Sequence, residues 1–242
     1  MKYRLGEILL DVGAREDVVA RCLGRVGHGG VIFTVNSLMA ERAFCDADFL
    51  SVLNSSDLNT VDGVGVRVAL ALCGVGTDVL AGVELGEIIT GKGTASLGII
   101  GGREGVAERA FLCLKAKNPS LRRSFILSGF GKSDAEYLRV IAEKRPKICF
   151  ICLGSPRQEY LAVKAHAISK KTLFLALGGS LDVYSGDKAR APKTLRRAGL
   201  EWLYRMVREP VRFAALPHLF SFLFRAFRTR RKNKQKSPGG TK

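Results

Sequence analysis

Residues 96–105 read SLGIIGGREG and decide the fold of this chain. Ser96–Ile100 is an apolar run with the length of a buried strand, and two glycines follow it directly. From Glu104 to Lys117, apolar side chains recur at helical spacing. A strand that ends in a glycine-rich turn and continues into an amphipathic helix is typical of folds built on a parallel sheet.

The same order of strand and helix recurs along the chain. It predicts an α/β fold, Rossmann-like, with a mainly parallel sheet and helices on both faces. Cys149 and Cys152 form a C-x-x-C within one predicted strand, where this spacing directs them to opposite faces. We interpret them as two core cysteines rather than a redox or zinc pair. Further strands are predicted at 31–35, 58–61, 124–127, 147–153 and 172–177, and helices at 37–53, 64–73, 133–144 and 157–168.

The positive charge of the chain is concentrated at its C-terminal end. The formal net charge is +17, and residues 188–242 hold 16 Lys/Arg against 2 Asp/Glu, whereas residues 1–187 hold 23 against 20. Such asymmetry indicates a polyanionic partner, either an anionic membrane or nucleic acid. We expect an α/β body at 1–190, a helical basic appendage at 191–229 and a disordered basic tail at 230–242.

An apolar stripe in the appendage favours a membrane over nucleic acid. Phe220, Leu223, Phe224 and Phe227 recur on one helix face beside many arginines and lysines. Helices that lie in a membrane interface combine these features, and docking against the body is the alternative. The sequence has neither a signal-peptide pattern nor the roughly 20 apolar residues of a spanning helix. We therefore expect a cytoplasmic protein, peripheral on the inner face of the membrane.

Polar residues and glycines follow the predicted strands at one edge of the sheet. Because ligands of open α/β folds bind at the carboxyl ends of the strands, we expect a nucleotide site along this edge. Glycines in such turns let backbone N–H groups approach a phosphate, and tight packing explains them equally well. The residues concerned are Thr34, Asn36, Asp62-Gly63, Gly101-Gly102, Gly129, Gly154 and Gly178-Gly179.

Two candidate sites each have two interpretations at this point. Asp62 precedes a predicted helix, so it is either an N-cap or a carboxylate exposed in the crevice. A carboxylate there is ionised at neutral pH and accepts a hydroxyl proton as a general base. Arg205, Arg208 and Arg212 share one helix face, which is either a solvated basic face or a clamp on a diphosphate.

Eight short motifs occur in order along the chain and carry a resemblance. They are Thr34-x-Asn36, Asp62-Gly63, Gly101-Gly102, Pro156-x-Gln158-Glu159, Gly178-Gly179-x-x-Asp182, Arg190-Ala191-Pro192, Gly199-Leu200-Glu201-Trp202-x-Tyr204-Arg205 and Glu209-Pro210-x-Arg212. In this order they resemble the WecG/TagA/CpsF family of bacterial glycosyltransferases. The resemblance covers about residues 5 to 215.

The resemblance implies an inverting sugar transfer that needs no metal and no cofactor. The donor would be a UDP-sugar, carrying N-acetylmannosamine or its uronic acid. The acceptor would be N-acetylglucosamine on a polyprenyl diphosphate, undecaprenyl diphosphate, in the synthesis of teichoic acid or another surface polysaccharide. The appendage would close over the site and contact the membrane. Members of the family often self-associate, so a homo-oligomer is one alternative for the state of this chain.

The resemblance also assigns catalytic and sugar-binding residues by matching position. Asp62 would be the base that deprotonates the acceptor hydroxyl, with Thr34 beside it in the catalytic centre. Asn36 and Gln158 would line the pocket of the sugar and the diphosphate. Without a metal, arginines and helix N-termini would stabilise the leaving UDP.

Nucleotide-binding roles follow from the same match. Gly129, Phe130 and Asp182 would hold the uridine. Arg205 and Arg212 would reach the diphosphate from the appendage.

The chain departs from the family pattern at positions near the diphosphate. Val79 and Glu84 stand where the family has the arginine and the aspartate of Arg-x-x-Gly-x-Asp, and Ala215 stands where a further arginine often follows. The family's Gly-Tyr-Phe appears here as Gly-Phe-Gly from residue 129. Arg157 or Arg208 are candidates to compensate. The alternatives are another donor, UDP-glucose or UDP-galactose, and a non-catalytic relative that binds only nucleotide or nucleic acid.

Overall fold

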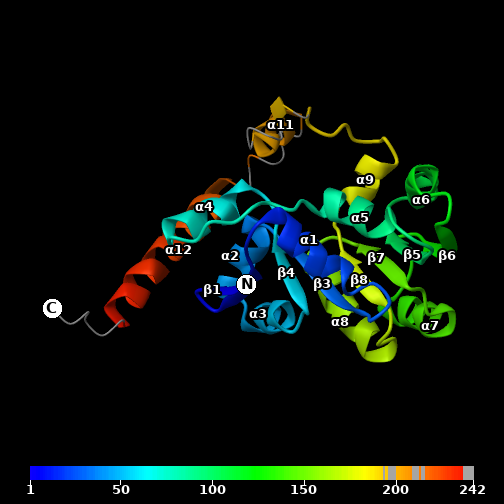
Figure 1. Ribbon diagram of the computed structural model, residues 1–242, viewed down its shortest axis with the longest axis horizontal. Coiled ribbons are helices and arrows are strands. Elements are labelled where there is room, and N and C mark those ends of the chain that lie inside the picture. Colours follow the sequence, from blue (N-terminus) through cyan, green and yellow to red (C-terminus); the bar gives the residue numbers. More distant parts are fainter. Residues whose placement is uncertain (193, 196–199, 209–212, 214–215, 237–242) are drawn as a thin grey trace.

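The structure, a computed structural model, describes residues 1–192, 194–195, 200–208, 213 and 216–236. These residues form one eight-stranded sheet in the order β1-β2-β4-β3-β8-β7-β5-β6 (Figure 1). β1 (Lys2–Leu5) pairs antiparallel with β2 (Ile8–Asp11), and all other neighbouring strands are parallel. The predicted α/β fold with a mainly parallel sheet is confirmed.

The remaining strands and the helices alternate as the sequence predicts. The other strands are β3 (Gly30–Val35), β4 (Leu58–Val61), β5 (Ser96–Gly101), β6 (Arg122–Leu127), β7 (Ile148–Cys152) and β8 (Leu173–Ala176). The helices of the body are α1 (Arg15–Leu23), α2 (Ser37–Cys45), α3 (Ala47–Asn54), α4 (Val64–Leu72), α5 (Gly82–Thr90), α6 (Val106–Lys117), α7 (Asp134–Lys144), α8 (Arg157–Ile168) and α9 (Ser180–Tyr184). α11 (Glu201–Arg208) and α12 (Leu216–Lys236) follow in the C-terminal part.

Two features of the first third differ from the sequence prediction. The segment expected as one helix at 37–53 is two helices, because Asp46 adopts an extended conformation between them. Its carboxylate accepts a hydrogen bond from the Phe49 N–H at 2.9 Å and so caps α3. The hairpin of β1 and β2 was not predicted, and it adds the antiparallel edge to the sheet.

Helices cover both faces of the sheet and bury two apolar clusters. One cluster joins the sheet to α2, α3, α4, α7, α8 and α12, and the other joins it to α1, α5, α6 and α9. Cys149 belongs to the first cluster and Cys152 to the second. Both are free and buried, and burial raises the pKa of both thiols. The interpretation of two separate core cysteines is confirmed.

Helix α12 packs on α2 and α4 through one of its faces. The side chains of Phe222 and Ala226 are fully buried, and the Phe222 ring stacks on Phe44 with 6.1 Å between centroids. A Cβ added at Gly65 would lie 2.8 Å from the Leu219 side chain, so the glycine allows this close approach. The first half of α12 is therefore part of the hydrophobic core, although it lies in the segment expected as an appendage.

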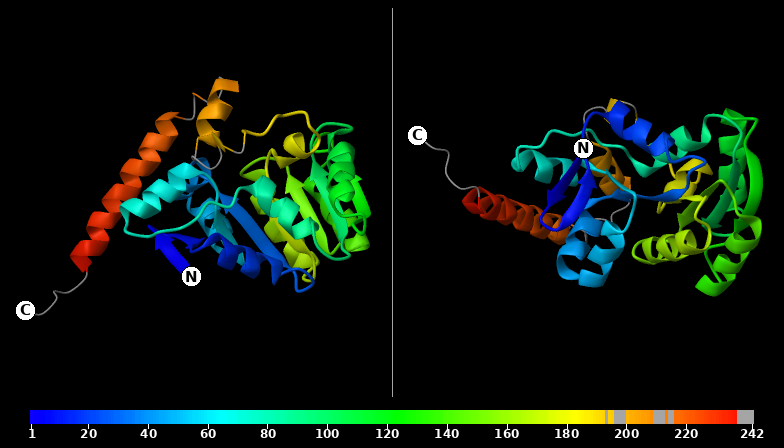
Figure 2. Two further views of the ribbon diagram at one scale, coloured as in Figure 1. Left: turned by 45° about the horizontal axis from the view of Figure 1, so that its top comes forward. Right: turned by 60° about the horizontal axis from the view of Figure 1, so that its bottom comes forward.

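The predicted stripe of α12 divides between two environments. Leu223 packs against the core, whereas Phe220 and Phe224 are 66% and 61% exposed and Phe227 is 40% exposed. One face of α12 thus docks on the body, and another face exposes aromatic side chains. The far end of α12 extends away from the body, and no helix among the described residues is long and apolar enough to cross a membrane (Figures 1 and 2).

The basic end of the chain differs in part from the expected disordered tail. α12 continues to Lys236, so residues 230–236 are helical. Arginine, lysine and glutamine are good helix formers, and extending a helix that is already docked needs no new nucleation. Residues 237–242 lie outside the described residues.

Candidate active site

Thr34, Asn36 and Asp62 meet at the carboxyl ends of two neighbouring strands. β3 and β4 are parallel and in register, with Thr34 beside Thr60 and Val35 beside Val61. The Asp62 N–H donates to the Val35 carbonyl at 2.9 Å, which continues the ladder by one residue. The expected convergence of these three residues at one edge is therefore present in the fold.

The carboxylate of Asp62 lies at the start of α5. Its Oδ2 accepts from the Gly82 N–H at 3.4 Å, and Gly82 is the first residue of that helix. The positive end of the helix dipole favours a negative charge there. Gly63, not Asp62, occupies the N-cap position of α4, and α4 has no side-chain cap. Of the two interpretations, the geometry does not support the N-cap of the following helix, and Asp62 is a half-buried carboxylate at the edge of the sheet.

Gly82 brings the hydroxyl of Thr34 to the same place. Thr34 is buried, and a Cβ added at Gly82 would lie 3.0 Å from its Oγ1. A side chain at position 82 would push α5 away from β3. Gly82 was not among the predicted site residues, although it lies in the Val79-x-x-Gly82-x-Glu84 segment that was compared with the family pattern.

Asn36 has a structural role that would limit its contact with any ligand. It is the N-cap of α2, and its Oδ1 accepts from the N–H groups of Leu38 at 3.0 Å and Met39 at 3.1 Å. Within the described part of the chain, its Nδ2 makes no hydrogen bond. The amide nitrogen is therefore the atom of Asn36 that is available to a sugar or phosphate oxygen.

Gln158 lies at the start of α8 and contacts the end of β8. Its Oε1 accepts from the Gly178 N–H at 3.0 Å, and its Nε2 donates to Glu159 Oε1 at 2.7 Å. Gln158 is buried and Glu159 is completely buried. Burial raises the pKa of the Glu159 carboxyl above its ordinary value of 4.5, against the opposing effects of hydrogen bonds and of Arg42.

Replacing Glu159 by glutamine should make stability less sensitive to rising pH. The unfolded carboxyl ionises near pH 4.5, whereas the folded one resists ionisation, so the wild type loses stability as the pH rises through the raised pKa. Urea unfolding of both proteins from about pH 4.5 to about pH 8 measures this, and the advantage of the variant should grow with pH. Glu104→Gln, at an exposed position, is the control. A pH-independent difference would contradict the prediction.

Two of the segments assigned to uridine, those of Gly129 and Asp182, approach the turn at Gly102. The Gly129 N–H donates to the Gly102 carbonyl at 3.0 Å, and a Cβ at Gly102 would lie 3.5 Å from Leu181, the neighbour of Asp182. Asp182 Oδ2 pairs with Lys188 at 3.3 Å. Phe130 is 67% exposed and lines a cavity of about 560 Å³. The other residues of this cavity are Arg103, Glu104, Ala107, Glu108, Ile126, Ser128 and Gly131.

Glu84 joins three parts of the chain through two arginines. Its carboxylate pairs with Arg15 at 2.8 Å and with Arg190 at 2.7 Å. Burial alone would raise the pKa of Glu84, but the two guanidinium groups lower it below the ordinary value. Arg15 also donates to the Val79 carbonyl at 3.2 Å. An arginine from α1 thus reaches Val79, the position at which the family has an arginine. Sequence reasoning missed Arg15, because it lies 64 residues from Val79.

The arginines considered as compensation lie in different surroundings. Arg157 pairs with Asp134 at 2.9 Å and lies over the Tyr137 ring at 5.6 Å, so it holds α7 and α8 together. Arg208 is exposed and lies 5.5 Å over the Tyr204 ring of α11. The described geometry therefore leaves Arg208, rather than Arg157, as the candidate. The side chain of Arg205 and the whole of Arg212 lie outside the described residues.

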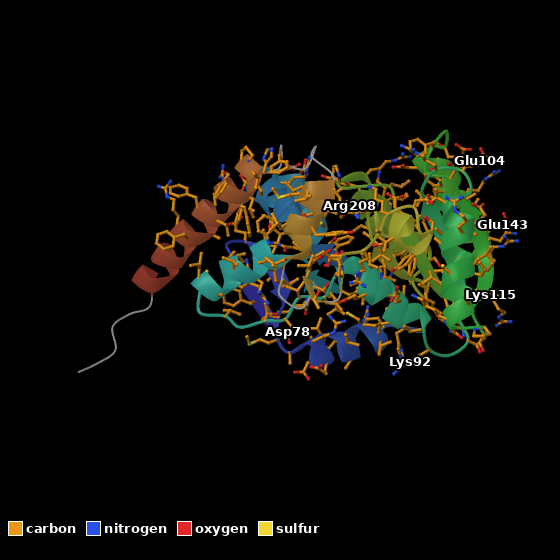
Figure 3. All side chains as sticks on the ribbon, turned by 90° about the horizontal axis from the view of Figure 1, so that it is seen from above. Asp78, Lys92, Glu104, Lys115, Glu143 and Arg208 are labelled. Atoms are coloured by element: carbon orange, nitrogen blue, oxygen red, sulfur yellow. The ribbon has the colours of Figure 1, made fainter. Side chains whose placement is uncertain are left out.

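Helix α11 lies on the side of the molecule where the strands of the site end. It is on the same side as α9, which follows β8, and from above it crosses the middle of the molecule with Arg208 on it (Figures 1 and 3). Met206 is buried, but Trp202, Leu203 and Val207 are 42%, 42% and 70% exposed. α11 therefore presents apolar side chains to its surroundings as well as arginine.

The residues described include no group of three or more His, Cys, Asp or Glu side chains that could hold a metal ion. Metal independence stays a prediction from the resemblance.

Comparison with known proteins assigns the family. The model of the family described as "Glycosyl transferase WecG/TagA/CpsF family" matches residues 3–236. An N-acetylglucosaminyldiphosphoundecaprenol N-acetyl-beta-D-mannosaminyltransferase of Bacillus subtilis (strain 168) is 30% identical over 189 residues, 76% of this chain and 74% of the relative. A protein of the same name from Staphylococcus aureus (strain MW2) is 24% identical over 208 residues, 84% of this chain and 82% of the relative. The resemblance is confirmed, and the chain belongs to the WecG/TagA/CpsF family of glycosyltransferases.

Proposed function

We propose that this glycosyltransferase moves N-acetylmannosamine, or its uronic acid, from UDP to N-acetylglucosamine on undecaprenyl diphosphate. The names of the relatives support this sugar and this acceptor. The observation that carries the proposal is the carboxylate of Asp62, held by the Gly82 N–H beside the buried hydroxyl of Thr34. It lies at the edge of the sheet where α/β folds bind their ligands.

In the proposed reaction, Asp62 accepts the proton of the acceptor hydroxyl. The hydroxyl oxygen then forms a bond to the anomeric carbon as the bond between that carbon and the UDP oxygen breaks, which inverts the configuration. A carboxylate base of this kind contributes about 10²–10⁴ in rate. Thr34, Asn36 and Gln158 hold the sugar and the diphosphate, and Gly129, Phe130 and Asp182 hold the uridine.

The negative charge that develops on UDP needs donors in place of a metal. Backbone N–H groups after β5, and the arginines of the C-terminal part, serve this role in the proposal. Arg208 on α11 and the basic residues Arg205 and Arg212 are the candidates. Loss of one such donor reduces the rate by about 10²–10³.

Sugar transfer to a lipid acceptor tests the proposal directly. The purified protein is incubated with N-acetylglucosamine on undecaprenyl diphosphate and a panel of labelled donors. We expect transfer from UDP-N-acetylmannosamine or its uronic acid, in the presence of a chelator. Transfer from UDP-glucose or UDP-galactose alone would replace the donor in the proposal, and UDP binding without transfer from any donor would support a non-catalytic relative.

The exposed phenylalanines of α12 support a peripheral contact with an anionic membrane. Phe220 and Phe224 are largely exposed on a helix whose second half is basic, and α11 adds Trp202, Leu203 and Val207. Aromatic side chains beside arginines and lysines suit the boundary between lipid headgroups and acyl chains. Such a contact would bring the crevice to a lipid-linked acceptor.

Replacing Phe220, Phe224 and Phe227 together by serine should weaken binding to anionic vesicles by about tenfold or more, because each buried aromatic ring contributes about 1.5–3 kcal/mol. Sedimentation with phosphatidylglycerol vesicles measures the effect. Leu112→Ser, which changes an equally exposed apolar side chain on α6, is the control. Unchanged vesicle binding, or salt-sensitive binding to duplex DNA in its place, would contradict the membrane role.

A further inference from the structure

The amide of Gln158 is held from two sides by partners of opposite character. The Gly178 N–H donates to Oε1 at 3.0 Å, and Nε2 donates to Glu159 Oε1 at 2.7 Å. A flipped amide would place Nε2 against the Gly178 N–H and Oε1 against a carboxyl oxygen. The Gly178 N–H would then face a donor and an ionised Glu159 would face an acceptor, so these two partners together favour one orientation of the amide.

This orientation leaves one donor of Gln158 uncommitted. The Nε2 group has two N–H bonds, and one of them is used by Glu159. Gln158 makes no other side-chain hydrogen bond within the ranges that the structure describes. The side chain of Gln158 comes from α8, and its amide lies at the end of β8. β8 is the neighbour of β3, the strand that carries Thr34.

A glutamate at position 159 lowers the stability of the fold. It is completely buried, and its Oε2 has no hydrogen-bond partner among the described side chains and backbone. A buried carboxyl with an unsatisfied oxygen destabilises a fold, and an apolar side chain of similar size often serves stability better. Its Oε1 accepts from Gln158 Nε2 at 2.7 Å, and hydrogen bonding by Ser155 and the charge of Arg42 only partly offset the effect of burial on the pKa of the Glu159 carboxyl.

We infer that Glu159 is a positioning residue that acts through Gln158, and that it directs the free Nε2 N–H of Gln158 to an oxygen of the sugar or the diphosphate. The inference rests on the proposed function, because it needs a donor substrate with such oxygens. It adds to that function a residue which does not itself touch the substrate. Gln158 is the contact, and Glu159 fixes its orientation.

Three substitutions at position 159 separate positioning from simple filling of space. Glu159→Met fills the site without an acceptor, and kcat/KM should fall by about tenfold or more, as for other residues that orient a binding group. Glu159→Asp keeps a carboxyl but withdraws it by one methylene, and it should lose activity similarly. Glu159→Gln keeps an oxygen acceptor at the same reach and should restore most of the activity that the methionine variant loses.

A double-mutant cycle with Gln158→Ala supplies the decisive measurement. If Glu159 acts through Gln158, replacing Glu159 by methionine or aspartate should cause no further loss of kcat/KM in the Gln158→Ala protein. Thermal unfolding of each variant checks that it is folded. If the Glu159→Met protein is unfolded, the cycle with Glu159→Asp decides the question. Multiplicative losses in the double variants would overturn the inference.

The wild-type protein separates failure of the inference from failure of the proposed function. If the wild type transfers no sugar from any donor, the proposed function fails. Calorimetric binding of UDP-N-acetylmannosamine then replaces kcat/KM in the same cycle, and independent effects of the two residues on Kd would overturn the positioning role. If the wild type is active and the losses multiply, only the role of Glu159 is lost.

Discussion

Asp62→Asn should reduce sugar transfer by about 10²–10⁴ while UDP still binds. Asparagine keeps the size of the side chain and an oxygen that can accept from the Gly82 N–H, so the local fold is retained. It cannot take up a proton from the acceptor hydroxyl. The loss should therefore appear in kcat for transfer to the lipid-linked acceptor, and calorimetric titration with UDP should give a similar Kd.

A second aspartate provides the matched control for this measurement. Asp48 is exposed in the first turn of α3, on the same side of the sheet as α2 but away from Gly82. Asp48→Asn should transfer sugar at the wild-type rate. If Asp62→Asn retained full activity, the base would be another group, and the role of the Asp62 carboxylate would reduce to holding the start of α5.

Phe222→Ala should lower the free energy of unfolding by about 3–5 kcal/mol, the range found for buried phenylalanines. The side chain is completely buried between α12 and the body, and its ring stacks on Phe44. The substitution would leave a cavity where the Phe222 ring was. Because α12 already packs tightly against α4 where Leu219 meets Gly65, this cavity can collapse only in part. Urea unfolding followed by circular dichroism measures the change.

The same helix offers a control that differs only in the direction of the side chain. Phe220 is 66% exposed, and Phe220→Ala should change the free energy of unfolding by no more than about 0.5 kcal/mol. Equal effects of the two substitutions would mean that α12 is not docked on α2 and α4 in solution. A large loss from Phe222→Ala alone would establish α12 as part of the folded body.

The sheet could be predicted because its strands are short apolar runs bounded by glycine and polar residues. Strand 58–61 and helix 157–168 were predicted with the bounds that they have in the structure. The β1–β2 hairpin was missed because its first strand, Lys2–Leu5, alternates charged and apolar residues in a segment too short to show a period. Docking of α12 on the body was only the alternative to a membrane contact, because that helix is apolar on two sides and three of the four residues of the predicted stripe are exposed.

The candidate site could be predicted where it depends on strand ends, and not where it depends on tertiary pairing. Thr34 lies near the end of β3 and Asp62 directly follows the neighbouring strand β4, so their approach is implied by a parallel sheet. Arg15 reaches Glu84 over 69 residues of chain, and no local pattern indicates such a contact. The hydrogen bond between Gln158 and Glu159 joins adjacent residues, but its meaning depends on burial, which only the fold determines.

The C-terminal part is attached to the body at two separate places. Ala191 is buried next to the ion pair of Arg190 and Glu84, and α12 enters the core again at Phe222. The docked half of α12 is therefore held against the body and cannot swing outward as a free arm would. Because the same core sets the direction of Phe220 and Phe224, a bilayer that received these rings would also hold the Asp62 edge of the sheet at one fixed tilt. Every lipid-linked acceptor would then approach Asp62 from the same direction.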